Sequence, residues 1–142
     1  MNDVELKRNA SLEEVEFIEL YRSVEWGHAK CPRALLAAIA NSSLVISAHV
    51  DGKLIGLGRA ITDTTITVYF PDLLIMPQYQ RQGIGTKIMT LLLEEYGSLH
   101  NQVLIAQDEA ARAFYHKLGF KDEKFAMAIL KNFPDESADK AR

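Results

Sequence analysis

Two glycines one residue apart, Gly83 and Gly85, follow an apolar, strand-like run and precede an amphipathic helical pattern. At such a strand-to-helix junction several backbone amides point outward together, and the helix dipole adds partial positive charge. Glycine also lacks the side chain that would hold phosphate oxygens away from the backbone. The segment therefore favours a pyrophosphate site, although a tight connection without a ligand would use the same two glycines equally well.

Two familiar phosphate-binding loops do not fit this segment. A dinucleotide-binding fingerprint needs a third glycine at position 88, where the sequence has Ile88. A Walker loop needs Gly-Lys followed by Ser or Thr, whereas Gly85 is followed by Thr86 and then Lys87. The sequence therefore excludes both classes of nucleotide site at this loop.

A second motif lies downstream, and the two motifs together resemble the GNAT superfamily of acyl-CoA-dependent N-acyltransferases. That family's loop pattern is met by Gln80, Gly83 and Gly85. Its later Phe-Tyr and Gly-Phe signature is met by Phe114, Tyr115, Lys117, Gly119 and Phe120. The resemblance extends over nearly the whole chain. It implies one acetyltransferase domain over residues 1–131, followed by a polar C-terminal tail over residues 132–142 that we expect to fray.

The resemblance also implies how acetyl-CoA binds as a cosubstrate. Backbone groups of Leu74, Ile75 and Met76 would pair with the pantetheine arm, where their strand splays from the next one at a bulge. The pyrophosphate would be held by the amides of the loop residues Arg81, Gln82, Gly83, Ile84, Gly85 and Thr86.

Two further positions bear on the cofactor. Asp108 stands where the family often has Asn; it can cap a helix, but an ionised carboxylate cannot donate a hydrogen bond to pantetheine. Lys117 would contact the cofactor phosphates, or be an ordinary solvated helix charge.

Acyl transfer from a thioester to an amine needs a neutral amine, a donor to the carbonyl oxygen and a proton for the departing thiolate. Tyr115 matches the family's general acid, the alternative being a structural tyrosine half-buried against the sheet. Asp72 lies in an apolar run, where it would take the amine proton or hold its charge, unless it is merely a solvated residue at a kink after Pro71. An outward amide of Leu74 or Ile75 would stabilise the oxyanion.

The acceptor is expected to contact Glu25 and Trp26, which lie between the first two helices, over the acceptor end in this family. A flat apolar ring beside a carboxylate suits a small, neutral-to-cationic primary amine with an apolar or aromatic body. Trp26 would otherwise pack into the core. The segment looks, more loosely, like the branch containing plant chloroplast serotonin N-acetyltransferases and small bacterial relatives. A non-catalytic acyl-CoA-binding or sensing module is the alternative to direct acetyl transfer in a ternary complex.

The composition limits the other classes of partner and site. The 142 residues are 48% hydrophobic and 25% charged, which fits one ordinary domain, and the net charge of −3 disfavours a nucleic-acid partner. The longest apolar run is too polar to cross a membrane, so we expect no membrane partner and a cytoplasmic location. A lone Cys31 and histidines without ligand spacing predict no metal site. Members of this family are often dimers, so a homodimer stays open.

These residues must be positioned by a sheet and helices that the periodicity predicts. We expect a first strand near residues 4–6, a helix over 11–24 opened by a capping box of Ser11 and Glu14, and a second helix from Pro32. Strands are expected over residues 44–50, 54–61, 65–76, 102–106 and 120–130, with helices after the glycine loop and after Asp108. The fold class is α/β (α+β): a mixed, mostly antiparallel sheet, splayed at the acyl-CoA site and flanked by about four helices.

Overall fold

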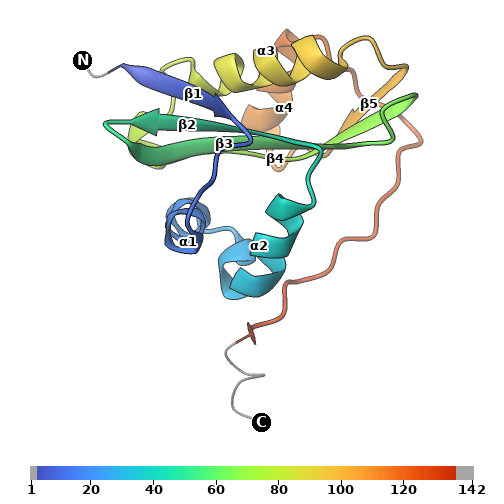
Figure 1. Ribbon diagram of the computed structural model, residues 1–142. Helices are drawn as coiled ribbons and strands as arrows, with labels where there is room; N and C mark the ends of the chain where they lie inside the picture. The colour runs from blue at the N-terminus through green and yellow to red at the C-terminus, as the bar shows by residue number, and fades with distance from the viewer. Residues whose placement is uncertain (1–2, 137–142) are drawn as a thin grey trace.

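The computed structural model describes residues 3–136, which form a five-stranded sheet with helices on both faces (Figure 1). In chain order the described elements are β1 (Val4–Arg8), α1 (Glu14–Ser23), the 3-10 helix η1 (Gly27–Lys30), α2 (Pro32–Ala40), β2 (Leu44–Val50), β3 (Lys53–Thr62), β4 (Thr67–Ile75), the 3-10 helix η2 (Pro77–Tyr79), α3 (Ile84–Tyr96), β5 (Asn101–Leu104) and α4 (Glu109–Lys117). The expected sheet with four flanking α-helices is confirmed for this part of the chain.

The strands lie side by side in the order in which they occur along the chain. β1 to β4 pair antiparallel, and β5 pairs parallel to β4, so the sheet is mixed and mostly antiparallel, as expected. Helices α1 and α2 cover one face and α3 and α4 the other (Figure 1). The core fills both layers: α3 buries Ile88 and Leu92 against the sheet, and α1 buries Leu20 and Tyr21.

Local turn chemistry explains several element boundaries. Asp51 and Gly52 both have positive φ angles, of 50° and 79°, as the tight turn between β2 and β3 requires. Pro32 occupies the first turn of α2, where a missing amide hydrogen costs nothing. Asp108 caps α4 by accepting a hydrogen bond from the Ala111 amide at 2.8 Å.

Strand β4 runs past the end of β5, and this opens the sheet. β4 pairs with β5 only over Thr67 to Phe70, because β5 ends at Leu104. The register between β3 and β4 shifts between Arg59 and Ile61, which places one extra β4 residue in a bulge beside Pro71. The rest of β4 therefore has a partner on the β3 side and a gap on the β5 side, which is the predicted splay.

The expected start of the first helix was wrong by two residues, since its N-cap is Glu13 rather than Ser11. The helix begins at Glu14, and the Glu16 side chain accepts a hydrogen bond from the Glu13 amide at 3.4 Å, so Ser11 and Glu14 do not form its capping box. The reason lies just upstream, where Asn9 adopts a φ of 48° and exchanges hydrogen bonds with Val45 at the end of β1. This turn delays the helix beyond Ser11.

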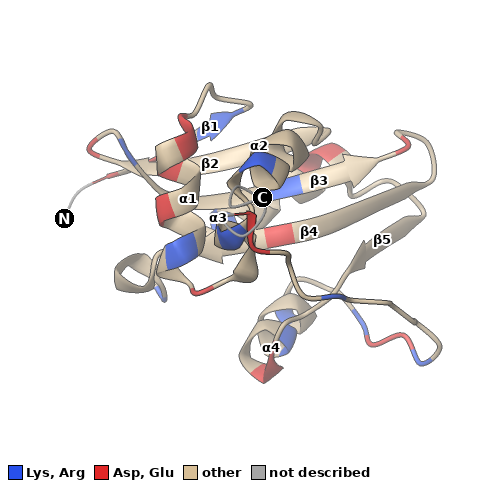
Figure 2. Ribbon diagram, turned by 90° about the horizontal axis from the view of Figure 1, so that it is seen from below, with Lys and Arg blue, Asp and Glu red and all other residues tan. Residues whose placement is uncertain are grey.

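The last expected strand, over residues 120–130, was also wrong. No strand occurs in this segment; it leaves the α4 side, passes the β5 edge and reaches the α2 side as an extended chain (Figures 1 and 2). Its side chains Phe125, Met127 and Ile129 are 79%, 95% and 88% exposed. Apolar alternation favours a strand only where the chain meets a free sheet edge, and here it passes that edge without pairing.

Candidate active site

The gap beside β4 contains two adjoining cavities that share part of their lining. The first, of about 680 Å³, lies at the N-termini of α3 and α4 and is called the loop cavity below. The second, of about 810 Å³, contains Asp72 and is called the aspartate cavity. The residues that line both are Glu25, Trp26, Leu73, Gln107, Ala111 and Phe114. A ligand long enough to cross Leu73 would occupy both.

The loop cavity is bounded by backbone amides that make no hydrogen bonds within helix α3. Gly83 adopts a φ of 82° at the start of α3, and the first hydrogen bond of that turn runs from the Lys87 amide to the Gly83 carbonyl. The amides of residues 84–86 therefore precede the helix's own bonds, at its positive end. The Gln80 side chain donates to the Ile75 carbonyl at 2.8 Å and fixes the loop on the end of β4.

A β-carbon at Gly85 would lie 3.5 Å from Phe114 Cζ and 3.8 Å from Leu73 Cδ2. Those are ordinary contact distances, so the fold itself would tolerate a methyl group there. The glycine leaves free the space between β4 and α4 through which an extended ligand would pass. This geometry fits a diphosphate at the α3 amides with an arm leading toward Leu73.

Strand alternation decides which β4 amides face the gap. The Met76 amide donates to the Ile55 carbonyl at 2.8 Å, so Met76 and, two residues earlier, Leu74 turn their amides toward β3. Leu73 and Ile75 turn theirs the opposite way, toward the gap left by β5. Of the residues expected to pair with the pantetheine arm, Ile75 turns its amide to the gap; the expectation was wrong for the amides of Leu74 and Met76, which face β3, so Leu74 does not supply the outward amide expected for the oxyanion. Leu73 was missed, because the side to which each amide points depends on the register with β3.

Asp72 is the centre of a buried polar cluster in the aspartate cavity. Its carboxylate accepts hydrogen bonds from the Tyr21 hydroxyl at 2.8 Å and from Arg59 Nε at 2.6 Å, and His28 Nε2 lies 3.4 Å from its other oxygen. Only 4% of Asp72 is exposed, so the alternative of a solvated residue at a kink does not hold. Burial alone would raise the pKa of this carboxyl, but the His28 and Arg59 contacts outweigh burial and lower it.

The electrostatic consequence is a carboxylate that stays ionised. Burial, then the charge of Asp72 and its hydrogen bond, raise the pKa of Tyr21 well above its ordinary value, so this hydroxyl remains a donor. The Arg59 guanidinium also donates to the Ser42 hydroxyl at 3.3 Å, which holds it in place. Asp72 is therefore suited to holding a positive charge nearby, and poorly suited to removing a proton itself.

His28 is the residue of this cluster that sequence reasoning missed. Its ring lies between those of Tyr21, Trp26 and Phe133, with centroids 5.0, 5.5 and 4.3 Å away. Its Nδ1 is buried and has no hydrogen-bond partner among the described residues. The available signal was its place two residues after Trp26, in the segment assigned to the acceptor; without the Asp72 contact, a lone histidine gave no reason to select it.

Tyr115 lies opposite this cluster, on α4, and lines the aspartate cavity. Its ring packs edge-on against Phe114 and Phe120, with centroids 5.1 and 5.8 Å away. Burial, with a contribution from the charge of Asp72, raises the pKa of Tyr115 to about 12. The hydroxyl therefore keeps its proton at neutral pH and is available as a donor.

The comparisons with known proteins decide the family. The family model of the acetyltransferase (GNAT) domain matches residues 10–126. Over 125 residues the chain is 30% identical to an uncharacterised N-acetyltransferase, ycf52, of Pyropia yezoensis, covering 83% of this chain and 70% of that protein. The chain belongs to the GNAT acetyltransferase family. It is an acetyl-CoA-dependent acetyltransferase.

Solved structures agree on the fold. A GNAT-family acetyltransferase of Streptococcus pneumoniae has a TM-score of 0.78 at 24% identity, covering 92% of this chain and 100% of that one. An aminoglycoside N-acetyltransferase, AAC(6')-Iy, solved in complex with CoA, has a TM-score of 0.71 at 13% identity, covering 94% of this chain and 97% of that one. At these identities the likeness concerns the fold.

Most residues expected to hold acetyl-CoA line the loop cavity of this GNAT acetyltransferase: Leu74, Ile75, Arg81, Gly83, Ile84, Gly85, Thr86 and Asp108. Three do not line it. The Met76 amide is used by the sheet, Gln82 donates its side-chain amide to the Gln78 carbonyl at 3.3 Å, and Lys117 lies in the last turn of α4. Glu25 and Trp26 line both cavities.

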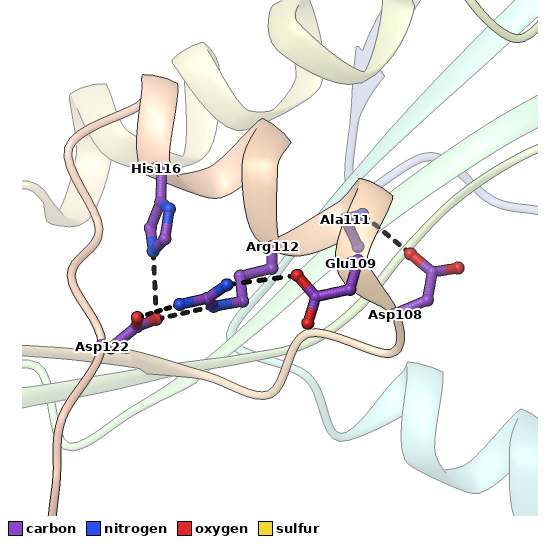
Figure 3. Close-up of polar contacts among 6 residues, drawn as sticks. All are labelled: Asp108, Glu109, Ala111, Arg112, His116 and Asp122. Atoms are coloured by element: carbon purple, nitrogen blue, oxygen red, sulfur yellow. Dashed lines mark hydrogen bonds and ion pairs between the residues drawn. The ribbon is translucent and has the colours of Figure 1, made fainter.

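Helix α4 is fixed by polar contacts along its whole length (Figure 3). Besides the Asp108 cap, Arg112 pairs with Glu109 and Asp122, and His116 Nε2 lies 3.0 Å from Asp122. These contacts tie the chain that follows α4 back onto the helix. One carboxylate oxygen of Asp108 thus accepts the capping hydrogen bond, and an ionised carboxylate has no hydrogen to donate to a ligand.

No helix in residues 3–136 is long and apolar enough to span a membrane. No group of three or more acidic, histidine or cysteine side chains within that range is arranged to hold a metal ion.

Proposed function

We propose that this acetyltransferase moves the acetyl group of acetyl-CoA to the primary amine of a small molecule, by direct attack in a ternary complex. The observation that carries the proposal is the junction of the two cavities at Leu73. One cavity offers helix N-terminal amides suited to a diphosphate, and the other places an ionised carboxylate opposite a protonated phenol. The thioester would lie where they meet.

The acceptor would enter as an ammonium ion and must lose a proton before it attacks. Asp72 would hold the positive charge, because its carboxylate is already stabilised in the ionised form by Arg59 and Tyr21. His28 would take the proton, since its ring lines the aspartate cavity beside Asp72 and an imidazole is a suitable base near physiological pH. This assigns Asp72 the charge-holding role and leaves proton removal to its neighbour.

The amine nitrogen then bonds to the thioester carbonyl carbon, and the negative charge that develops on the oxygen needs a donor. The amides of Leu73 and Ile75 face the gap and would supply it. As the carbon–sulfur bond breaks, the thiolate leaves with the electron pair and takes a proton from the Tyr115 hydroxyl. The nitrogen, which became positively charged on bonding to carbon, loses its second proton to the resulting phenolate through water, and His28 releases the first proton to solvent. The products are the acetylated amine and CoA.

The lining of the aspartate cavity supports an amine with an apolar or aromatic body. The rings of Trp26, His28 and Phe133 lie on one side, and the carboxylates of Glu25 and Asp72 supply negative charge. Flat rings of this kind pack against an aromatic acceptor and attract a cation. This is the acceptor class expected from the segment around Trp26, and the looser resemblance to serotonin N-acetyltransferases points the same way.

The proposal is tested by measuring thiol release from acetyl-CoA over a panel of arylalkylamines, polyamines, aminoglycosides and lysine peptides. We expect release to require an amine, to be fastest with arylalkylamines, and to give intersecting initial-velocity lines. Parallel lines would contradict direct attack, and a preference for aminoglycosides or lysine peptides would contradict the acceptor class. Tight acetyl-CoA binding without turnover on any amine would favour a sensing module instead.

A further inference from the structure

The chain beyond α4 is fastened at both ends across the aspartate cavity. At one end Asp122 pairs with Arg112 and His116 on α4, contacts that help to lower the pKa of this carboxyl to about 2 (Figure 3). At the other end the Glu136 carboxylate accepts hydrogen bonds from the amides of Arg33 and Ala34, both at 3.1 Å. Residues 122–136 are called the C-terminal strap below.

The second attachment uses the exposed end of α2. The first amides of a helix have no hydrogen-bond partner within the helix. A carboxylate accepts their hydrogen bonds, and its negative charge is stabilised by the positive end of the helix dipole. Glu136 is only 9% exposed, although it follows a largely exposed segment. The described start of the expected polar tail is therefore packed against the domain, and residues 137–142 lie outside the described part of the chain.

Between its two attachments the strap supplies one side of the aspartate cavity. Ile129, Leu130, Lys131 and Phe133 line it together with His28 and Asp72. The Phe133 ring lies against the His28 ring, with centroids 4.3 Å apart and planes inclined by 39°. The width of the cavity thus depends on where Phe133 lies.

Gly27 makes this placement of the ring possible. A β-carbon at that position would lie 3.0 Å from Phe133 Cδ2, closer than nine in ten real contacts of this kind, so the ring would have to shift by a few tenths of an ångström. Glycine at the start of η1 therefore leaves space for the phenyl group to reach His28. Phe133 nevertheless remains 43% exposed.

We propose that Phe133 is a specificity-determining residue that limits the size of the amine's body beside His28, and that Glu136 is its positioning residue. This inference rests on the proposed acetyl transfer to a small amine. A body with two bulky rings would collide with Phe133 while its amine is beside His28. Truncating Phe133 would admit the larger body, and detaching Glu136 would do so in part, since the ring would no longer be held.

The test compares phenylethylamine with diphenylpropylamine, which differ in the number of rings beyond the amine arm. We expect the wild-type protein to prefer phenylethylamine in kcat/KM, and Phe133→Ala to shift the ratio toward diphenylpropylamine by about tenfold or more, as for removal of a close steric contact. The KM for acetyl-CoA should not change, because no strap residue lines the loop cavity. Phe125→Ala is the matched control: it truncates an exposed phenylalanine of the same strap that lines neither cavity.

Glu136→Ala should shift the ratio in the same direction as Phe133→Ala but less, and Glu136→Gln should restore part of the wild-type ratio because its amide oxygen can still accept one hydrogen bond. If Glu136 had only a structural role, Glu136→Ala would lower the melting temperature without changing the ratio of kcat/KM for the two amines. If Phe133→Ala does not fold, Phe133→Leu decides instead. A ratio that stays within twofold, or that moves equally in Phe125→Ala, would overturn the inference.

Failure of the strap and failure of the proposed function give different results. The chain has one tryptophan, Trp26, which lines the aspartate cavity, so its fluorescence reports amine binding without turnover. If no amine is acetylated, the proposed function fails, and the selectivity of the strap is still read from fluorescence titrations with both amines in the presence of CoA. If acetylation occurs with an unchanged selectivity, only the strap inference fails.

Discussion

Replacing Gly83 by alanine separates the cost to the fold from the cost to acetyl-CoA binding. Gly83 has a φ of 82°, lines the loop cavity, and would have no atom within 4 Å of an added β-carbon. Gly52, in the turn between β2 and β3, has nearly the same φ of 79° and the same free space, but does not line that cavity. The two substitutions therefore impose the same backbone strain, and only one places a methyl group beside the α3 amides.

The strain can be estimated for both variants. A left-handed conformation costs an ordinary residue about 1 kcal/mol more than glycine, which lowers the melting temperature of a domain of this size by roughly 3 to 4 °C. Gly83→Ala should in addition weaken acetyl-CoA binding, because a displaced phosphate loses a hydrogen bond to a charged group, worth about 1.5–3 kcal/mol. That corresponds to roughly a 10- to 150-fold higher Kd.

Differential scanning fluorimetry gives the two melting temperatures, and isothermal titration calorimetry gives the two dissociation constants. We expect equal thermal shifts, with weaker binding in Gly83→Ala alone. Gly85→Ala adds a third point, because its β-carbon makes only ordinary contacts and should leave the melting temperature unchanged or higher while weakening binding. Wild-type affinity in folded Gly83→Ala and Gly85→Ala would refute the phosphate-binding role of the loop.

Three further predictions concern the aspartate cavity. Tyr115→Phe should lower kcat by roughly 10- to 1,000-fold with acetyl-CoA affinity unchanged, measured under single-turnover conditions; an unchanged rate of chemistry would remove Tyr115 from the mechanism. His28→Asn should lower kcat at least about tenfold at neutral pH without weakening acetyl-CoA binding, and retention of the wild-type pH profile would exclude His28 as the base. Asp72→Asn should cost about 3 kcal/mol, or roughly 10 °C, because Arg59 is left buried without its partner. The pKa of Asp72 in the folded protein lies below its ordinary 3.8, so its contribution to the stability of the fold is complete above that pH and is lost as the pH falls further. Asp72→Asn should therefore make the melting temperature fall less steeply in acid than it does for the wild-type protein. An equal fall in both proteins would contradict this.

Much of the fold follows from local signals that the sequence states directly. The turn at Asp51 and Gly52, the helix start at Pro32 and the cap at Asp108 each depend on residues within a few positions. The glycine loop was predictable for the same reason, since its strand, turn and helix are consecutive. The missed helix start shows the limit, because the turn at Asn9 depends on Val45 in another strand.

The aspartate cavity could not be assembled in this way. Asp72 was singled out, but its partners Tyr21 and Arg59 lie 51 and 13 positions away, and His28 is on a separate 3-10 helix. Polar residues gain such roles only when the sheet brings them together. The strap was missed for the same reason: Glu136 bonds to an amide 103 positions earlier, and nothing in the residues around it distinguishes it from a solvated tail.

The most direct test of the central claim is the stoichiometry of one reaction. Purified protein is incubated with acetyl-CoA and phenylethylamine, and mass spectrometry quantifies N-acetylphenylethylamine while a thiol reagent quantifies free CoA. We expect the two products in a one-to-one ratio, both dependent on the amine and both strongly reduced in Tyr115→Phe. CoA release without acetylated amine, or acetyl-CoA binding with neither product for any amine in the panel, would contradict acetyl transfer to a small primary amine.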